Sequence, residues 1–473
     1  MIIYHFSAEC YPIAKVGGLA DVVGALPKYQ QKEGYAAVVM PFYENKFIQT
    51  HWLDVVHQGD LLIGERYFTF EILKCTDGTA FDLYFVKIPY LLDREQVYGY
   101  HDDIERFLAF QIAGLKWILS FDVFPDVIHC HDHHTGFIPF LVQECFIFRR
   151  LRDIPTVFTI HNAEYQGYFG YDRLYYFPDY DRYQTGLLDW MNTINPMASA
   201  IKCAWKVTTV SPNYMQELML SANNLETLIS TEKQKCLGIL NGIDPEVWNT
   251  ESDPMLIKNY TKTTVQQGKK ANKESLCTDF DLDPEKPLFI FIGRLVREKG
   301  ADLFPELVHE VLGHRQLDVS LLFLGSGNSE IEQQLLALRE LYAGKYNVYV
   351  GYDESLSRRM YGGGDFLLMP SRVEPCGLNQ MYALRYGTIP IVRATGGLKD
   401  TVIDLNKSNG FGFVHQEASV PEIADTVERA VQLYGTPKIF QKLRKQIMQI
   451  DTTWNRSASE YIDLYKSLTI TYG

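Results

Sequence analysis

The stretch Asp365-Phe-Leu-Leu-Met-Pro-Ser-Arg-Val-Glu-Pro-Cys-Gly-Leu-Asn-Gln380 decides the fold that the sequence predicts. Its apolar run Phe366 to Met369 ends in a proline and predicts a buried parallel strand, and Gly377 begins an amphipathic segment that predicts a helix. Glu374 therefore lies on a strand-to-helix turn. The free N–H groups and the positive dipole end of the helix favour an anion at that turn, and a carboxylate beside it can bind hydroxyl groups. The stretch predicts a site for a phosphate next to a sugar.

Length and composition indicate a globular protein of two or three domains. The chain has 473 residues, of which 46% are hydrophobic and 22% are charged. Its net charge of -13 argues against a nucleic-acid surface, which requires a basic face, but allows a local basic pocket for a small anion. The eight cysteines form no Cys-x-x-Cys pair, which favours reduced thiols over a zinc knuckle or a disulfide framework. The N-terminus lacks the basic region of a signal peptide, and no apolar run reaches the roughly 18 residues of a membrane span, so we expect a soluble cytoplasmic protein.

The N-terminal half begins with a predicted strand, a glycine-rich loop and a helix. Ile2 to Ser7 predict the strand, and Gly17 and Gly18 begin the helix. Paired glycines let a backbone approach a ligand closely, and Lys15 adds a mobile positive charge that suits a phosphate near the helix N-terminus. A glycine turn with a solvated lysine is the alternative. The loop lacks the complete Gly-x-Gly-x-x-Gly pattern, so it does not predict a dinucleotide site.

Polar side chains follow the ends of two consecutive predicted strands. The strand 126–131 is followed by Asp132, and the strand 155–160 by His161 and Asn162. Ligands of open α/β sheets bind outside the carboxyl ends of the strands, so these groups predict a ligand crevice. A structural role for His161 is the alternative.

The histidines around Asp132 also allow a metal site. His129 and His131 share one face of a strand, and His133 and His134 follow directly. We favour the ligand crevice, because the ends of strands bring polar groups to one edge of a sheet by geometry alone.

The C-terminal half shows the same arrangement. The segment Gly293-Arg-Leu-Val-Arg-Glu-Lys-Gly300 follows the predicted strand 287–292. Arg294 and Lys299 are placed to bind an anion at the carboxyl edge of a strand, one as a planar fork and one as a point charge. Solvated loop charges are the alternative.

Three further patterns are weaker. Tyr352 follows the predicted strand 347–350, where it is either a stacking platform for a base or a turn aromatic. The string Asp279-Phe-Asp-Leu-Asp283 contains the Asp-x-Asp of metal-dependent glycosyltransferases, but it precedes its strand, so we interpret it as loop charges. Residues 17–23 and 396–402 share the pattern Gly-Gly-Leu-x-Asp-x-Val, which predicts a similar helix start in each half.

Six motifs in order give the chain a resemblance to bacterial glycogen synthases and plant starch synthases. The motifs are Lys-Val-Gly-Gly-Leu-Ala-Asp at 15–21, His-Cys-His-Asp at 129–132, Thr-Ile-His-Asn at 159–162, Asn-Gly-Ile-Asp at 241–244, the segment 293–300, and Ser-Arg-Val-Glu-Pro-Cys-Gly-Leu-Asn-Gln at 371–380. The resemblance covers nearly the whole chain. It departs at Val373, where the family often has Phe, and at Asn379, where it often has Thr. Tyr382 occupies the place of the second glutamate in the Glu-x7-Glu pattern of related transferases, which puts a two-glutamate mechanism in doubt.

The resemblance implies an α/β fold of the GT-B type, in which two Rossmann-like domains face each other across a cleft. We expect an N-terminal acceptor-side domain at 1–248, a polar linker at 249–275 and a nucleotide-sugar domain at 276–453. The C-terminal helix, within 454–473, is expected to cross back to the N-terminal domain.

The resemblance also implies the reaction and its residues. The family transfers glucose from ADP-glucose to the nonreducing end of an α-1,4-glucan with retention of configuration, without a metal or other cofactor. The implied catalytic residues are Glu374, His161 through its backbone carbonyl, Arg294, Lys299 and Asp132. The implied donor-binding residues are Lys15, Gly17, Gly18, Asp21, Asn162, Asn241, Tyr352, Cys376, Gly377, Leu378 and Asn379. The expected partners are ADP-glucose and a glycogen-like α-1,4-glucan. We expect the chain to bind neither a nucleic acid nor a membrane.

Other functions remain as alternatives. A synthase of the same fold could use UDP-glucose, and a pyridoxal-phosphate-dependent glucan phosphorylase or a noncatalytic glucan-binding protein could share the architecture. A nicotinamide dehydrogenase is disfavoured, because the chain lacks the complete glycine fingerprint followed by an acid about 20 residues later.

Overall fold

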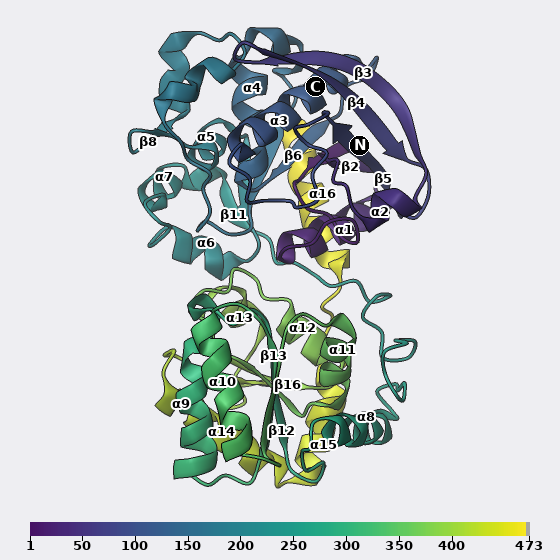
Figure 1. Ribbon diagram of the computed structural model, residues 1–473, viewed down its shortest axis with the longest axis vertical. Coiled ribbons are helices and arrows are strands. Elements are labelled where there is room, and N and C mark those ends of the chain that lie inside the picture. Colours follow the sequence, from purple (N-terminus) through teal and green to yellow (C-terminus); the bar gives the residue numbers. More distant parts are fainter. Residues whose placement is uncertain (470–473) are drawn as a thin grey trace. The chain divides into compact units, whose positions relative to one another are not determined.

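The computed structural model describes residues 1–469 and divides into two compact units (Figure 1). The first unit contains residues 1–241 and the C-terminal segment from Trp454, and the second contains Gly242–Thr453. The structure differs from the sequence-based domains in two respects. Residues 242–248, which were expected in the N-terminal domain, are grouped with the second unit, and so is the expected linker 249–275. The last four residues of the expected segment 454–473 lie outside the described residues.

The first unit is built on a nine-stranded sheet in which most neighbours are parallel. The hairpin strands β3 and β4 are antiparallel to each other, and β4 is antiparallel to β5. The strand order is β11 (Cys236–Gly238), β10 (Lys206–Thr209), β7 (Thr156–Ile160), β6 (Val127–His131), β1 (Ile2–Phe6), β2 (Tyr35–Pro41), β5 (Asp82–Lys87), β4 (Arg66–Cys75) and β3 (Leu53–Ile63). A separate pair is formed by β8 (Asp189–Trp190) and β9 (Thr193–Ile194).

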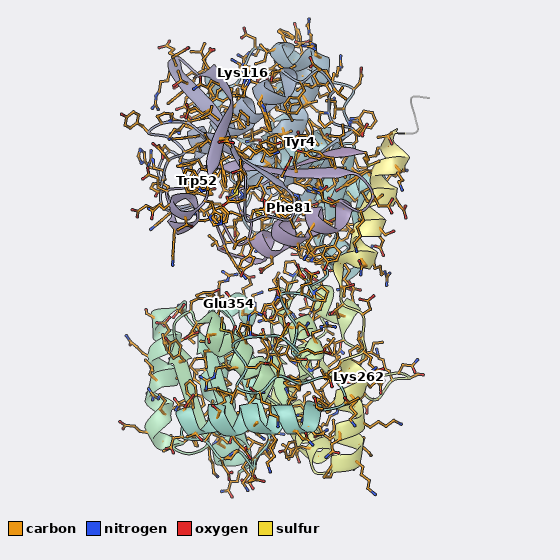
Figure 2. The ribbon with its side chains drawn as sticks, turned by 90° about the vertical axis from the view of Figure 1, so that its right-hand side faces the viewer. Tyr4, Trp52, Phe81, Lys116, Lys262 and Glu354 are labelled. Atoms are coloured by element: carbon orange, nitrogen blue, oxygen red, sulfur yellow. The ribbon has the colours of Figure 1, made fainter. Side chains whose placement is uncertain are left out.

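The central strands of this sheet are buried on both faces, as apolar parallel strands require. Tyr4 of β1, labelled in Figure 2, packs edge to face on Trp117 with ring centroids 5.8 Å apart. The helices of the unit are α1 (Gly18–Gln30), α2 (Lys46–Thr50), α3 (Asp103–Leu119), α4 (Ile138–Glu144), α5 (Pro196–Cys203), α6 (Pro212–Leu218), α7 (Glu226–Thr231) and α16 (Trp454–Thr469).

Helix α16 returns from the second unit to the first and completes its core. Trp454, Tyr461 and Tyr465 are buried in one hydrophobic cluster with Ile3 of β1 and Val22 of α1. The expectation that the last helix crosses back to the N-terminal domain is confirmed.

The second unit has a six-stranded sheet in which every neighbouring pair is parallel. The strand order is β14 (Tyr346–Val350), β13 (Ser320–Gly325), β12 (Leu288–Ile292), β15 (Phe366–Met369), β16 (Ile389–Arg393) and β17 (Phe413–His415). The helices are α8 (Val265–Asp279), α9 (Phe304–Val308), α10 (Ser329–Leu341), α11 (Glu354–Gly363), α12 (Asn379–Arg385), α13 (Gly396–Thr401), α14 (Val420–Tyr434) and α15 (Pro437–Ile447).

Buried charges explain why part of the expected linker belongs to the second unit. Lys273 of α8 forms an ion pair with Asp365 at the start of β15, with Nζ and Oδ2 2.7 Å apart, and Arg444 of α15 pairs with the same carboxylate. Lys269 donates to the hydroxyl of Thr388 at 2.7 Å. By contrast, Lys262 lies exposed in the preceding polar segment (Figure 2). Polar residues that look like a linker in the sequence therefore fasten α8 to the sheet.

Each sheet contains one point at which the strand order reverses. In the second unit, β13 and β14 extend the sheet on one side of β12, and β15 to β17 extend it on the other. In the first unit the reversal lies between β1 and β6. Crevices at such switch points bind ligands in doubly wound folds, so the loops after β1, β6, β12 and β15 are where a site is expected.

Among the described residues, we find no helix that combines the length and the apolar character needed to cross a membrane.

Candidate functional site

The loop after β1 holds Lys15 in a defined conformation. Glu9 accepts hydrogen bonds from the backbone N–H groups of Val16 and Gly17 at 2.6 and 2.9 Å and from the Tyr98 hydroxyl at 2.7 Å. Lys15 forms an ion pair with Asp21 of α1, with Nζ and Oδ1 2.8 Å apart. A Cβ atom added at Gly17 would meet nothing within 4 Å, so the chain itself does not require a glycine there. Open space at this position fits the close approach of a ligand.

Asp132 and His161 meet at the neighbouring strand ends, after β6 and β7. The Oδ1 atom of Asp132 accepts a hydrogen bond from the backbone N–H of His161 at 2.7 Å. Asp132 has a φ of 56°, a left-handed conformation that is uncommon for a residue other than glycine. Such strain is typically kept where the surrounding structure fixes a functional group.

The carboxyl of Asp132 titrates close to neutral pH. Burial raises its pKa from 3.8 to about 7, and the backbone N–H groups of His161 and Asn162 oppose that rise. A buried acid that changes charge near pH 7 at a strand end is typical of a functional site.

The other predicted site residues of the first unit that can be placed are Asn162, Asn241 and Gly18, and each has a different environment. Asn162 accepts the N–H of Glu164 at 2.9 Å, so its carbonyl oxygen closes a local turn. Asn241 is buried, and its Oδ1 has no hydrogen-bond partner within residues 1–469. Gly18 is the first residue of α1, as expected. Leaving a buried acceptor without a hydrogen bond is costly, so the Oδ1 atom of Asn241 is suited to accept a hydrogen bond from a ligand.

In the second unit, Glu374 and Lys299 meet at the switch point. Lys299 Nζ lies 2.7 Å from Oε1 of Glu374, and Oε2 of Glu374 accepts the Ser371 hydroxyl at 2.8 Å. Lys299 belongs to a short 3-10 turn, Arg297–Lys299, after β12, and Glu374 follows β15. The structure therefore brings together two residues that are 75 positions apart in the sequence.

Arg294 lies beside them, held by an acid that the sequence analysis did not single out. Its Nη2 is 3.3 and 3.4 Å from the two carboxylate oxygens of Glu298, whose Oε1 is also 3.9 Å from Lys299 Nζ. The backbone carbonyl of Glu298 accepts the N–H of Arg372 at 2.8 Å. Glu298 therefore contacts both cations and fastens their loop to the loop of Glu374.

The turn after Glu374 differs slightly from the expectation. Gly377 has a φ of 71°, which a helix does not allow, so α12 begins only at Asn379. The side chain of Asn379 donates to the backbone carbonyl of Ile292 at 2.7 Å and so fastens α12 to β12. Cys376 is buried and Leu378 is half-buried before the helix. The Asn379 amide is thus bound to β12 through its nitrogen and the Cys376 side chain is buried, so the expected donor contacts of both residues rest on the resemblance.

The second Gly-Gly pair has a packing role that the first lacks. A Cβ atom added at Gly396 would lie 1.9 Å from the carbonyl oxygen of Glu374, and one at Gly397 would lie 2.2 Å from that of Cys376. The N–H of Gly397 also donates to the Glu374 carbonyl at 3.0 Å. These glycines hold the Glu374 turn in place, whereas Gly17 faces open space.

Two aromatic residues of the second unit that the sequence analysis singled out have different environments. Tyr352 is 77% exposed after β14, as a stacking platform would be. Tyr382 instead stacks on Trp248 with ring centroids 3.6 Å apart, and the Arg358 guanidinium lies 4.2 Å from the Trp248 ring. The position that holds a second glutamate in related transferases is therefore a packing position in this chain.

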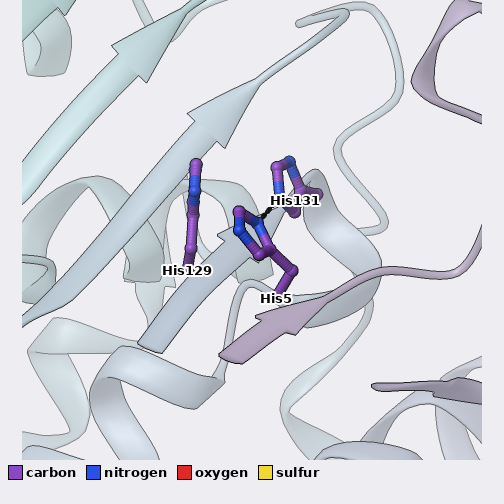
Figure 3. Close-up of side chains that lie close together, drawn as sticks. All are labelled: His5, His129 and His131. Atoms are coloured by element: carbon purple, nitrogen blue, oxygen red, sulfur yellow. Dashed lines mark hydrogen bonds between the residues drawn. The ribbon is translucent and has the colours of Figure 1, made fainter. Parts of the chain in front are cut away.

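The histidines form a different group from the one that the sequence suggested. His129 and His131 lie with His5 of β1, and their ring nitrogens are within 4.8 Å of one another (Figure 3). His134 stacks instead on Tyr98 with ring centroids 4.5 Å apart. The candidate metal group of the sequence analysis is thus divided, and His5 was missed.

Three functional candidates were missed altogether: Glu9, Glu298 and Ser371. Glu9 could have been found by the rule that selected Asp132, because it follows a strand that ends at the switch point. Glu298 and Ser371 carry no such signal, since their roles depend on contacts with Arg294, Lys299 and Glu374 that only the folded chain creates.

Family models match both halves of the chain. Residues 2–231 match the starch synthase catalytic domain, and residues 273–447 match the glycosyl transferases group 1. The chain is 52% identical over 467 residues to a glycogen synthase of Flavobacterium johnsoniae, covering 98% of each chain. It is 39% identical over 478 residues to one of Geobacillus stearothermophilus, covering 98% of this chain and 96% of that one.

Solved structures give the same result at the level of the fold. The catalytic domain of starch synthase IV from Arabidopsis thaliana, bound to ADP and acarbose, matches with a TM-score of 0.90 and 31% identity over 99% of both chains. Sucrose-phosphate synthase from Thermosynechococcus elongatus matches with a TM-score of 0.64 and 16% identity over 99% of both chains, which shows the fold alone.

Proposed function

The chain belongs to the family of glycogen synthases and starch synthases and is a glycosyltransferase of the GT-B fold, and we propose that it transfers glucose from ADP-glucose to the nonreducing end of an α-1,4-glucan with retention of configuration. The donor and the acceptor are nucleotide sugar and glucan in general, as in its relatives. The preference for ADP over UDP is supported by the related starch synthase, which is bound to ADP, and by the exposed ring of Tyr352.

The observation that carries the proposal is the contact of Lys299 with Glu374 at the switch point of the second sheet. A diphosphate leaving group gains negative charge when the glycosidic bond to glucose breaks. Arg294 and Lys299 are the cations that would stabilise this charge. Glu374, once Lys299 turns to the phosphate, is left to bind sugar hydroxyls. This arrangement explains why one acid, Glu374, and two cations, Arg294 and Lys299, lie on the two neighbouring loops after β15 and β12.

The first unit supplies the residues for the sugar. Asp132 accepts a hydrogen bond from the backbone N–H of His161 and so helps to fix the main chain of this residue. The resemblance places the backbone carbonyl of His161 beside the anomeric carbon of the donor. A carbonyl oxygen there stabilises the positive charge that develops on the sugar ring in the transition state. Lys15, held by Asp21 until the donor binds, offers a further cation for the phosphates.

We further propose that the reaction requires no metal ion. Two or three protein cations can supply the charge that a metal gives to other transferases. Two of the three acids in the Asp-x-Asp string already have protein partners, since Asp279 pairs with Arg359 and Asp283 accepts the N–H of Glu285.

A donor panel tests the proposal. The purified protein is incubated with glycogen or maltooligosaccharides and with ADP-glucose, UDP-glucose or glucose 1-phosphate in turn. We expect the highest kcat/KM with ADP-glucose and a product extended by α-1,4-linked glucose. A higher kcat/KM with UDP-glucose would reverse the donor assignment. Activity with glucose 1-phosphate, together with the absorbance of a bound cofactor, would indicate a phosphorylase. Glucan binding without turnover would indicate a noncatalytic protein.

A further inference from the structure

The first unit contains a buried, continuous relay of hydrogen-bonded side chains. It starts at Tyr465 of α16, passes through Gln30 at the end of α1, and reaches His161 after β7. Every side chain in it is buried. The members are Tyr465, Gln30, His5, His131 and His161 on one arm, and Tyr465, His129, Thr159 and Thr208 on the other.

The distances along the first arm are short. The His5 Nε2 atom lies 2.7 Å from Oε1 of Gln30, and its Nδ1 atom lies 3.0 Å from Nε2 of His131 (Figure 3). The His131 Nδ1 atom lies 2.9 Å from Nε2 of His161. On the second arm, the Tyr465 hydroxyl lies 2.6 Å from Nδ1 of His129 and 3.3 Å from Nε2 of Gln30.

These contacts argue against a metal centre at His5, His129 and His131. Both ring nitrogens of each histidine already have a protein partner. A metal ion would need a lone pair from each ring, so each ring would have to give up one of its two hydrogen bonds. The group is therefore complete as a hydrogen-bonded network.

Gln30 gives the network its direction. A neutral imidazole has one donor and one acceptor nitrogen, so each ring passes on the direction that it receives. The carbonyl oxygen of Gln30 accepts from Nε2–H of His5, which leaves Nδ1 of His5 to accept from Nε2–H of His131. The same step repeats between His131 and His161.

The second arm follows from the other end of the same amide. The Gln30 NH2 group donates to the Tyr465 hydroxyl, so that hydroxyl donates to Nδ1 of His129. The Nε2–H of His129 then donates to Thr159. With the Gln30 amide in this orientation, all four histidines are Nε2–H tautomers, and rotating the amide by 180° would convert all four to the Nδ1–H form.

We propose that Gln30, hydrogen-bonded to Tyr465, fixes the tautomer of His161 and is a positioning residue for the transfer reaction. The catalytic consequence rests on the proposed function, in which the His161 segment binds the donor sugar. The Nδ1 atom of His161 forms no hydrogen bond within residues 1–469, so it is the open end of the relay. In the observed direction it is a neutral acceptor for a hydroxyl group, and in the reverse direction it would be a donor.

Two further observations fit this role. Burial lowers the pKa of His161 to about 3 and that of His5 to about 4, so the relay carries no charge at neutral pH. The backbone N–H of His161 donates to Asp132, and its Nε2 atom is hydrogen-bonded to His131, so both the main chain and the ring of this residue are held in place.

The first test is spectroscopic and does not depend on turnover. The protein is labelled with ¹⁵N-histidine, and long-range ¹H–¹⁵N spectra at pH 7 distinguish Nε2–H from Nδ1–H rings, with His→Gln variants for assignment. We expect four neutral Nε2–H patterns for the relay. A neutral Nδ1–H pattern or a tautomer mixture at His161 in the wild-type protein would overturn the proposal, and so would stoichiometric zinc in the purified protein.

The second test uses a matched pair of variants. Gln30→Met removes the amide at similar length, whereas Gln30→Glu keeps an acceptor for His5. We expect Gln30→Met to give mixed tautomers at His161 and to lower kcat about 2- to 10-fold, the worth of one net hydrogen bond. Gln30→Glu should retain the His161 tautomer and most of the kcat, while His129 changes to the Nδ1–H form. An unchanged His161 pattern in Gln30→Met would remove Gln30 from the role.

A control separates positioning from stability. Ser457→Ala removes another hydrogen bond of α16, to the Leu240 carbonyl, and lies outside the relay. It should lower the melting temperature and leave kcat and the tautomers unchanged, whereas Tyr465→Phe should change the His129 pattern. If the protein transfers no glucose yet shows the four Nε2–H rings, the proposed function fails and the relay stands.

Discussion

Lys299 and Glu374 form an ion pair, with Nζ and Oε1 2.7 Å apart, across the point where the strand order of the second sheet reverses. Glu374 is only 7% exposed, and its other partner is the hydroxyl of Ser371. Lys299 therefore neutralises a carboxylate that would otherwise be buried with a single neutral partner. In the proposed function, a donor diphosphate would compete with Glu374 for the same ammonium group, so this pair would connect the stability of the site with its chemistry.

The first prediction concerns the two cations. Both donor phosphates are charged before the reaction, but bond breaking adds charge to the leaving phosphate, so Arg294 and Lys299 should bind the transition state more strongly than the substrate. We expect Arg294→Ala and Lys299→Ala to lower kcat by about 10² to 10³, and Arg294→Lys to recover little of it, because a point charge cannot replace a planar fork. Steady-state kinetics with varied donor measure both parameters.

The same variants should differ in stability. Lys299→Ala leaves Glu374 buried without a cation, whereas the side chain of Arg294 is half exposed and its bond to Glu298 is long. Thermal melts should therefore show a lower melting temperature for Lys299→Ala than for Arg294→Ala. A raised KM with unchanged kcat would show that the two cations bind substrate and transition state equally, contrary to this prediction.

The second prediction concerns Glu9, which fastens the loop of Lys15. Glu9→Gln keeps the size of the side chain but removes one of the two acceptor oxygens that bind Tyr98 and the N–H groups of Val16 and Gly17. We expect a loss of about 1 to 3 kcal/mol of unfolding free energy and a raised KM for the donor. In a double-mutant cycle with Lys15→Ala, the effects on KM should be less than additive; additive effects would show that Glu9 does not act through Lys15.

Much of the candidate site could be predicted because it depends on local sequence. The apolar runs that end at Ile160, Ile292 and Met369 are strands in the structure, and the polar residues after them lie at the carboxyl ends of the sheet. A parallel sheet brings such ends to one edge, so residues such as Asp132 and His161 could be expected to meet before any contact was known.

The remainder depends on contacts that a linear sequence does not encode locally. Gln30 and Tyr465 are 435 positions apart, and their hydrogen bond exists because α16 packs on α1. The segment 249–275 looks like a linker because its lysines are polar, yet Lys273 is buried against Asp365. The start of α12 was expected two residues early, because the sequence does not show that Gly377 adopts a left-handed φ.

The third prediction concerns pH and Asp132. Burial raises the pKa of this carboxyl from 3.8 to about 7, so between these values the folded protein holds a proton that the unfolded chain has lost. Folded stability contributed by Asp132 therefore falls as pH rises from about 4 to about 7. Asp132→Asn keeps the acceptor for His161 but cannot ionise. Relative to this variant, the wild-type protein should lose up to about 3 kcal/mol of unfolding free energy between pH 5 and pH 8.

Urea unfolding of both proteins across this range measures the difference directly. The comparison is needed because the buried histidines act in the opposite direction: burial lowers their pKa, so their contribution is lost as pH falls below about 6.5. Since both proteins contain these histidines, their effect cancels. Parallel stability profiles would show that Asp132 is ionised throughout.

The fourth prediction concerns metal ions. Turnover should be unchanged after exhaustive dialysis against EDTA, because in the proposed function Arg294 and Lys299 supply the positive charge for the diphosphate, and Asp279 and Asp283 of the 279–283 string have protein partners. The measurement is the initial rate with and without added magnesium or manganese. Activity that is lost on chelation and restored by either ion would contradict this expectation.

The last prediction concerns Glu298, whose carboxylate lies 3.3 Å from Arg294 and 3.9 Å from Lys299. This acid contacts the two cations that bind the donor diphosphate in the proposed function, so it should weaken the binding of both ADP-glucose and ADP. Glu298→Gln removes the charge but leaves the backbone carbonyl that accepts the N–H of Arg372. A partly exposed ion pair contributes up to about 1 kcal/mol, so we expect ADP to bind about two- to fivefold more tightly.

Calorimetric titration with ADP measures this change, and a matched control is available on the same unit. Glu310→Gln makes the same substitution at an acid that pairs with Arg315 at 2.8 Å and belongs to the helical segment His309–His314. It should alter stability but not the Kd for ADP.

Because tighter product binding slows release, Glu298→Gln should also lower kcat if ADP release limits turnover. This decrease in kcat should diminish at higher salt, because salt screens the phosphate contacts. Unchanged or weaker ADP binding in Glu298→Gln would show instead that Glu298 preorganises the two cations and that its charge assists the donor site.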